Sequence, residues 1–210
     1  MLKEACVENF TNVPGVIERG AKRIELCDNL AVGGTTPSIG VIKITAEYCS
    51  DKDASIIVIL RPRGGDFVYS LMEKAIMMRD LEEIIASHAN GIAVGALTAV
   101  NDLDKPFLEE IAKLAIANGT ELVFHMAFDQ IPEDKQRDAL LWLREIGFTR
   151  ILTHGGPTEN TIFDNAAHIA DLAKISPDMT IMPGGGIMKD NLADLEKVLE
   201  LTEVHGTRIV

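Results

Sequence analysis

Eight short runs of β-forming residues alternate with helical stretches along the whole chain, and this alternation limits the fold more than any other feature. The predicted strands are Leu2 to Val7, Arg23 to Cys27, Ser55 to Leu60, Gly91 to Gly95, Glu121 to Phe124, Arg150 to Thr153, Thr180 to Met182 and Glu203 to His205. Helical connections of this kind are crossovers, which make consecutive strands parallel. Eight such units predict an α/β fold, a (β/α)8 TIM-type barrel.

The chain is predicted to form a single barrel domain over residues 1–210, because its 47% hydrophobic composition supplies one large core and no linker interrupts the pattern. An open doubly wound sheet is the alternative, but no Gly-x-Gly-x-x-Gly turn follows the first strand. The sequence stops directly after the eighth predicted strand, so the final helix is missing or outside the chain. Uncovered faces of the first and last strands would favour a homo-oligomer.

Capping residues and prolines predict several helix boundaries. Thr36 precedes Pro37 as an N-cap, and Asp104 stands just ahead of a proline at the start of another helix. Gly119 and Gly147 fit the C′ position, where a helix ends in a left-handed turn.

The net charge of -12 argues against nucleic-acid and anionic membrane partners, since both require basic surfaces. No run approaches the roughly 18 apolar residues of a membrane span, and Lys3 and Glu4 stand where a signal peptide would be apolar. Three cysteines in 210 residues fit reduced thiols better than a disulfide framework. The expected location is the cytoplasm.

Two arginines and a carboxylate follow the third predicted strand in the segment Arg61-Pro-Arg63-Gly-Gly-Asp66. Side chains at the carboxyl ends of barrel strands usually face a ligand, and arginine suits carboxylates and phosphates. Arg61, Arg63 and Asp66 are therefore candidate ligand-binding residues for a small anion. The alternative is that Arg61 or Arg63 pairs with a carboxylate inside the fold.

The first two predicted strands both contain Glu-x-Cys. Because strand residues two apart share a face, Glu4 lies with Cys6 and Glu25 with Cys27, and Glu25 and Cys27 are assigned to the barrel interior. Two thiols on adjacent strands could share one soft ion such as Cu(I). The alternative is that both are small buried hydrophobic residues. The buried glutamates need partners, and Arg61 is the expected one.

Histidines follow three other predicted strands. Period two aligns His125 with Asp129 after the fifth strand, a pair suited to proton transfer, so Glu25, His125 and Asp129 are the candidate catalytic residues. His154 follows the sixth strand and His205 ends the eighth, and both are candidate ligand-binding residues. A core histidine bonded to a carbonyl is the alternative for His125, and the spacing gives little support for one metal held by all three histidines.

Three glycines, Gly184, Gly185 and Gly186, follow the seventh predicted strand. Barrels often hold a phosphate on backbone N–H groups in the loops after strands seven and eight, so these glycines are candidate anion-binding residues. A flexible rim loop without a ligand is the alternative.

Several of these motifs together resemble the CutC family. They are Arg23-Ile-Glu-Leu-Cys27, Gly33-Gly-Thr-Thr-Pro-Ser-Ile-Gly40, Arg61 to Asp66, the strand from Gly91 to Leu97, His125 to Asp129, His154-Gly-Gly156 and Val204-His205. The resemblance covers nearly the whole chain. It implies a cytoplasmic (β/α)8 barrel that takes part in copper homeostasis, with Cys6 and Cys27 as ligands of Cu(I), and it implies no particular enzymatic reaction.

Two functions therefore stay open at the level of sequence. The first is Cu(I) binding in copper homeostasis by Cys6 and Cys27. The second is an enzyme of unassigned reaction that acts at the barrel rim on a small anionic metabolite, which could be phosphorylated. Copper binding alone leaves the polar residues Arg61, Arg63, Asp66, His125, Asp129 and His154 without a role, and this favours the anion site. The resemblance favours copper.

Overall fold

The computed structural model describes all 210 residues as one (β/α)8 barrel. The strands are β1 Leu2–Glu8, β2 Arg23–Cys27, β3 Ser55–Ile59, β4 Gly91–Val94, β5 Glu121–Phe124, β6 Arg150–Thr153, β7 Thr180–Pro183 and β8 Glu203–Gly206. The helices are α1 Val13–Glu18, α2 Ile39–Asp51, α3 Leu71–Ala86, α4 Lys105–Ala117, α5 Glu133–Glu145, α6 Ala166–Ile175 and α7 Lys189–Leu195, with 3₁₀ turns η1 Leu30–Val32 and η2 Met126–Gln130. The predicted strands and fold class are confirmed.

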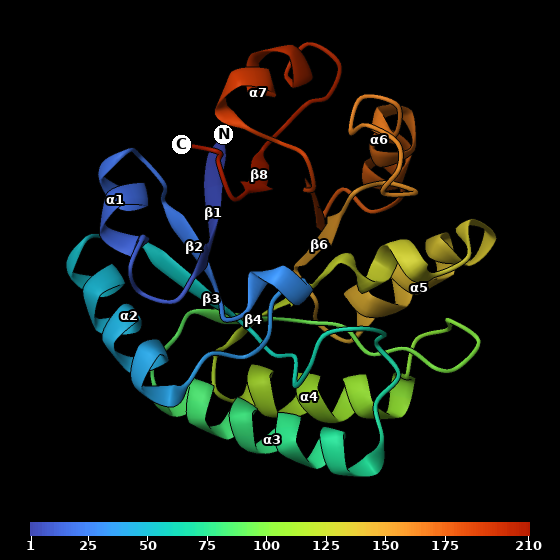
Figure 1. Cartoon of the computed structure of the whole chain (residues 1–210). Coiled ribbons are helices and arrows are strands. Elements are labelled where there is room, and N and C mark those ends of the chain that lie inside the picture. Colours follow the sequence, from blue (N-terminus) through green and yellow to red (C-terminus); the bar gives the residue numbers. More distant parts are fainter.

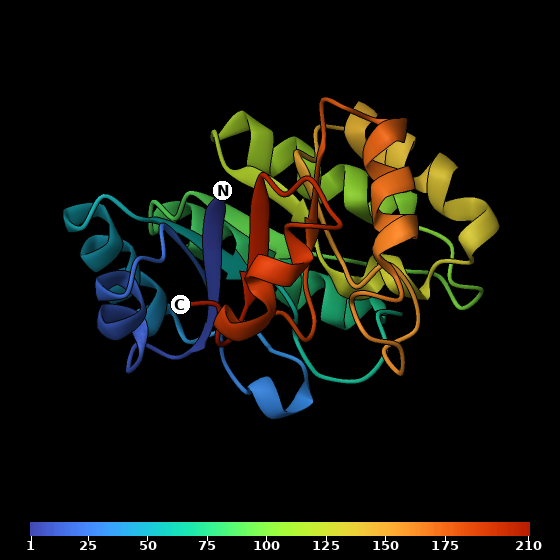
Figure 2. The same ribbon diagram turned by 90° about the horizontal axis from the view of Figure 1, so that it is seen from above.

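All registered strand pairs are parallel, in the order β7, β6, β5, β4, β3, β2, β1, β8. The strands at the two ends of this order, β7 and β8, lie near each other without a regular ladder, so the barrel is nearly closed. Figure 1 shows the strands enclosed by a ring of helices, and Figure 2 gives the view at right angles.

The alternation of side chains along each strand divides the core into two layers. Outward-facing residues such as Ile24 and Leu26 of β2 belong to a cluster of 49 buried residues shared with the helices. Inside the barrel, a smaller cluster consists of Ile57, Ala93, Val123, Leu152 and Met182. The predicted assignment of Glu25 and Cys27 to the interior follows from the same alternation and is confirmed, since both line an internal cavity.

Most of the predicted helix signals are found. Gly119 and Gly147 follow the ends of α4 and α5 with φ of 70° and 101°. The predicted start of α2 was wrong by two residues, because Ser38 is the N-cap and its hydroxyl accepts the Val41 N–H. Thr36 instead bonds to the chain at Arg61, whose N–H lies 2.9 Å from the Thr36 hydroxyl oxygen.

No eighth helix follows β8, yet the outer faces of β1 and β8 are covered. Ala5, Val7 and Val204 are at most 3% exposed. Side chains of α1 and the buried Ile209 beyond β8 pack in the same cluster. The expectation of uncovered strand faces was therefore wrong, and the predicted homo-oligomer loses that reason.

Candidate functional site

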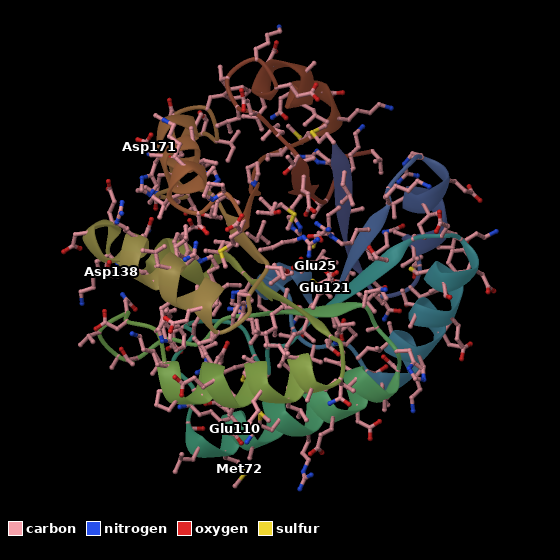
Figure 3. All side chains as sticks on the ribbon, turned by 180° about the vertical axis from the view of Figure 1, so that it is seen from behind. Glu25, Met72, Glu110, Glu121, Asp138 and Asp171 are labelled. Atoms are coloured by element: carbon pink, nitrogen blue, oxygen red, sulfur yellow. The ribbon has the colours of Figure 1, made fainter.

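A cavity of about 330 Å³ lies inside the barrel at the carboxyl ends of the strands. It is lined by Cys6, Glu25, Cys27, Leu30, Gly33, Ile59, Arg61, Phe67, His125, Met126, Leu152, Gly185, Gly186, Ile187, Met188, His205, Gly206, Thr207 and Arg208. Figure 3 shows Glu25 within the ring of strands, whereas Met72 and Asp171 lie on the outer helices. Residues from seven of the eight strand ends or their following loops therefore meet in one cavity.

A pair of free thiols forms one wall of this cavity. Cys6 of β1 and Cys27 of β2 are both buried, and their sulfurs are 3.9 Å apart. In the register of the two strands Cys6 lies opposite Glu25, and Cys27 lies opposite Glu8, so the sulfurs approach diagonally. The prediction that the sulfurs of Cys6 and Cys27 lie close together on adjacent strands is confirmed. That the thiols bind a metal stays a prediction.

The pKa values of the two thiols are shifted in opposite directions. A hydrogen bond from Cys27, helped by His205 and opposed by burial, lowers the pKa of Cys6 well below its usual value. The same hydrogen bond, with burial and the nearby Glu25, raises the pKa of Cys27 well above its usual value. Cys27 therefore keeps its proton and stabilises the Cys6 thiolate.

His205 of β8 carries the positive charge of the site. Its Nδ1 lies 2.8 Å from Oε1 of Glu4, and its Nε2 lies 3.6 Å from Oε2 of Glu25. Burial acts to lower the pKa of His205, but the charge of Glu25 and hydrogen bonds to Cys6 and Glu4 outweigh it and raise that pKa well above its usual value. Burial raises the pKa of Glu25 itself. The imidazolium thus lies among acidic groups and a thiolate.

The partner of the buried Glu4 is Arg23, and the predicted pairing of the glutamates with Arg61 was wrong. Arg23 lies directly opposite Glu4 in the strand register and forms ion pairs with Glu4 and with Glu203 of β8. These groups close the amino-terminal end of the barrel, where Arg150 adds a 2.7 Å ion pair to Glu203. Sequence reasoning missed Arg23, although period two places it on the same face as Glu25 and Cys27.

Arg61 points into the barrel from the end of β3 and makes no ion pair. Its Nη1 donates to the carbonyl oxygens of Val32, Gly33 and Gly34, and its Nη2 donates to that of Gly65. The loop after β2 therefore surrounds the guanidinium with neutral carbonyls, and Arg61 is too far from the glutamates to pair with them. The Nε of Arg61 is buried without a partner.

Arg63 and Asp66 do not line the cavity, so their predicted place in the site was wrong. Arg63 bonds to the Asp66 carboxylate at 3.0 Å and forms an ion pair with Glu73 of α3. Asp66 also accepts the N–H of Val68. The two residues stabilise the loop outside the barrel and the start of α3.

His125 follows β5 and lines the cavity. Its Nδ1 accepts the N–H of Ala127 at 3.2 Å, so its proton is on Nε2, which is buried and has no partner. Burial, with the charge of Arg61, lowers the pKa of His125 to about 3. In the folded protein the residue is therefore a neutral hydrogen-bond donor. The predicted role of His125 in proton transfer stays a prediction.

Asp129, in η2, and His154, just after β6, lie beside the cavity. The predicted period-two alignment of His125 with Asp129 fails because β5 ends at Phe124 and η2 follows. Asp129 accepts hydrogen bonds from Thr153 and from the N–H groups after β6, including that of His154 at 2.9 Å. Both ring nitrogens of His154 contact carbonyl oxygens. Neither side chain lines the cavity. His154 does line an adjoining pocket that shares Met126, Gly185 and Gly186 with the cavity. The catalytic role of Asp129 and the ligand-binding role of His154 stay predictions.

The three glycines after β7 have different roles: one extends the sheet, and two line the cavity. The N–H of Gly184 donates to the Thr153 carbonyl at 2.9 Å, so Gly184 continues the sheet. Gly185 and Gly186 have φ of 83° and 75° and line the cavity. On the same side of the cavity, on the chain after β8, lies Arg208, a cavity residue that no sequence motif indicated.

The side chains close enough to share one ion form two sets. One is Cys6, Glu25 and Cys27, and the other is Glu4, Glu25 and His205, each with donor atoms within 4.8 Å of one another. Neither set contains His125 or His154. The low expectation for a three-histidine metal site agrees with this geometry.

The fold and the site define a class of protein: a (β/α)8 barrel with a buried thiol pair in a cavity at the carboxyl ends of its strands. The CutC family model matches residues 1–210. A CutC family protein of Enterococcus faecalis is 47% identical over 211 residues, and one of Streptococcus pyogenes is 43% identical, each match covering 100% of both chains. The chain belongs to the CutC family.

Solved structures agree with this assignment. The crystal structure of CutC from Streptococcus agalactiae, whose name assigns it to copper homeostasis, has a TM-score of 0.95 and 40% identity and covers 100% of both chains. The deoxyribose phosphate aldolase of Aeropyrum pernix has a TM-score of 0.70 at 11% identity, covering 98% of this chain and 84% of the other. The second likeness shows the barrel fold alone. No helix of this chain is both long and apolar enough to cross a bilayer.

Proposed function

We propose that this protein binds Cu(I) through Cys6 and Cys27 as part of copper homeostasis. The observation that carries the proposal is the 3.9 Å separation of two unbridged, buried sulfurs. Two sulfurs bound to one ion at about 2.3 Å each can be at most about 4.6 Å apart. The thiols can therefore share an ion without a change in the backbone.

The donor set suits a soft, singly charged ion. Thiolates select Cu(I) over hard cations such as Mg²⁺ or Ca²⁺. Cys6 already favours the thiolate, and binding would displace the proton of Cys27, because a metal ligand must be deprotonated. Glu25 is the third side chain of the compact set, and its carboxyl oxygen is close enough to approach the ion. We expect about one proton to be released for each ion bound.

The setting of the thiols supports storage or transfer of copper inside the cytoplasm, where thiols stay reduced. Both sulfurs line a cavity that opens at the carboxyl ends of the strands. Apolar neighbours Leu30 and Ile59 pack against them and keep the thiols away from bulk solvent. A Cu(I) ion would be protected from oxidation there.

Titration of reduced protein with Cu(I), in competition with a chromophoric chelator, tests the proposal. We expect one ion per chain, and at least a hundredfold weaker binding in a Cys6→Ser, Cys27→Ser double variant. Cys49→Ser is the matched control, because Cys49 is buried on α2 far from the pair and should leave the affinity unchanged. Equal affinity in the parent and the double variant would exclude this site.

A further inference from the structure

We propose that the cavity also binds a small organic molecule through an oxyanion, a carboxylate or a phosphate, whose oxygens accept hydrogen bonds from Arg61 Nε and His125 Nε2. The two donors lie on the side of the cavity formed by the ends of β3 and β5 and the loops that follow them. This proposal does not depend on copper binding by the thiols.

The first observation is a buried guanidinium with no counter-ion. Arg61 is 5% exposed, and every partner of its Nη1 and Nη2 is a neutral carbonyl oxygen. A buried charge is costly unless it is paired and hydrogen-bonded. The carbonyls fix the orientation of the guanidinium and leave the Nε–H as its one buried donor without a partner. An anion in the cavity would supply both the missing charge and the missing acceptor.

The second observation is an independent donor on the neighbouring wall. His125 is 5% exposed, and its tautomer is set by the Ala127 N–H that Nδ1 accepts. Its Nε2–H therefore has to be a donor, and it has no acceptor within the protein. Buried donors without partners are rare in folded proteins, and one that lines a cavity indicates a ligand.

Packing holds the two donors on the same side of the cavity. The ring of Phe67 packs against both residues, with its centre 4.8 Å from the Arg61 guanidinium carbon and 5.0 Å from the centre of the His125 ring. Gly95, just after β4, makes room for the imidazole, since a Cβ there would lie 2.6 Å from Cε1 of His125. Both donors are thus oriented before any ligand arrives, which lowers the entropy cost of binding.

The rest of the cavity limits the size and chemistry of the ligand. A volume of about 330 Å³ suits a small metabolite. Leu152 and Ile187 supply apolar surface for its body. Gly185, Gly186 and Arg208 stand on a different wall, where a second anionic or polar group could be held. The ligand class is therefore a small acid with a short apolar body.

Nuclear magnetic resonance of metal-free, reduced protein labelled with ¹⁵N tests the proposal directly. Separate titrations use acetate, inorganic phosphate and, at equal ionic strength, chloride. We expect acetate or phosphate to shift the Arg61 Nε–H and His125 Nε2–H signals along one saturable curve, while the Arg63 Nε–H signal stays in place. Saturation by acetate or by phosphate identifies which oxyanion is preferred. Absence of saturable shifts, or the same shifts with chloride, would overturn the proposal.

A matched set of variants provides the second test. His125→Asn removes the Nε2 donor but keeps an acceptor for the Ala127 N–H, so it should fold and bind the oxyanion at least tenfold more weakly. Arg63→Ala, in the same loop as Arg61 but outside the cavity, should bind as the parent does. Arg61→Lys removes Nε and could fail to fold, in which case His125→Asn decides. Unchanged affinity in His125→Asn would refute the shared site.

The copper proposal and the anion proposal can each be refuted without the other. The anion titrations are repeated with the Cys6→Ser, Cys27→Ser double variant, which cannot form the thiolate site. Saturable shifts of Arg61 and His125 in that variant would support the anion site whatever the copper result. Loss of these shifts in the double variant alone would contradict the independence claimed here.

Discussion

Oε1 of Glu4, on the first strand, lies 2.8 Å from Nδ1 of His205, on the last strand. The same carboxylate pairs with Arg23 of β2. Burial acts to raise the pKa of Glu4, but the hydrogen bonds and charges of His205 and Arg23 outweigh it and lower that pKa. One buried carboxylate therefore joins β8, β1 and β2 and orients the imidazole that stabilises the Cys6 thiolate.

We expect Glu4→Gln to destabilise the protein by about 3 to 5 kcal/mol, because it leaves the buried charge of Arg23 less well paired. Urea unfolding followed by circular dichroism measures this loss. Glu110→Gln is the control, since Glu110 is exposed on α4 and forms no ion pair. A loss below about 1 kcal/mol would contradict the role given to Glu4.

The contribution of His125 to stability should fall between pH 7 and pH 5, because His125 stays neutral in the folded protein. Its folded pKa of about 3 lies below the unfolded value of about 6.5, so only the unfolded chain gains a proton in this range. The contribution of His125 to the free energy of unfolding has its full value well above pH 6.5. It decreases as the pH falls and is smaller by about 2 kcal/mol at pH 5. The measurement is the urea midpoint of parent and His125→Asn at both pH values, and an equal pH dependence would count against it.

Cys6 should react with iodoacetamide before the other thiols at pH 7. Its pKa is lowered by Cys27 and His205, whereas burial raises the pKa of Cys49 to about 11. The thiolate is the reactive form, and Cys6 lines the cavity. Mass spectrometry after brief alkylation identifies the modified residue, and Cu(I) added beforehand should block it. Faster modification of Cys49 would show that the assigned order is wrong.

Thr36→Val should cost about 1 to 2 kcal/mol, because the N–H of Arg61 loses the hydroxyl oxygen that accepts it at 2.9 Å. The change also loosens the backbone that carries the Arg61 guanidinium, so anion affinity should fall with stability. Thr35→Val is the neighbouring control, since the Thr35 hydroxyl makes only a 3.5 Å contact. Equal unfolding free energies for the two variants would contradict this.

The sequence predicted the fold correctly, but it did not predict which arginine enters the cavity. Arg61, Arg63 and Asp66 follow one strand in sequence, yet only Arg61 enters the barrel. Arg63 turns outward because Glu73 on α3 and the loop itself satisfy its charge. The Glu-x-Cys repeat, by contrast, depends only on strand alternation, and the sulfurs are found close together.

The sequence alone determined the eight strands, the inward direction of Glu25 and Cys27, and membership of a barrel fold, because strand period and crossover length are local properties of the chain. The tertiary structure decided which charges meet. Arg23 pairs with Glu4 through the strand register, and the loop after β2 surrounds Arg61 with carbonyls. Such partners come from residues far apart in the sequence, and their distances are set only when the barrel closes and its loops pack.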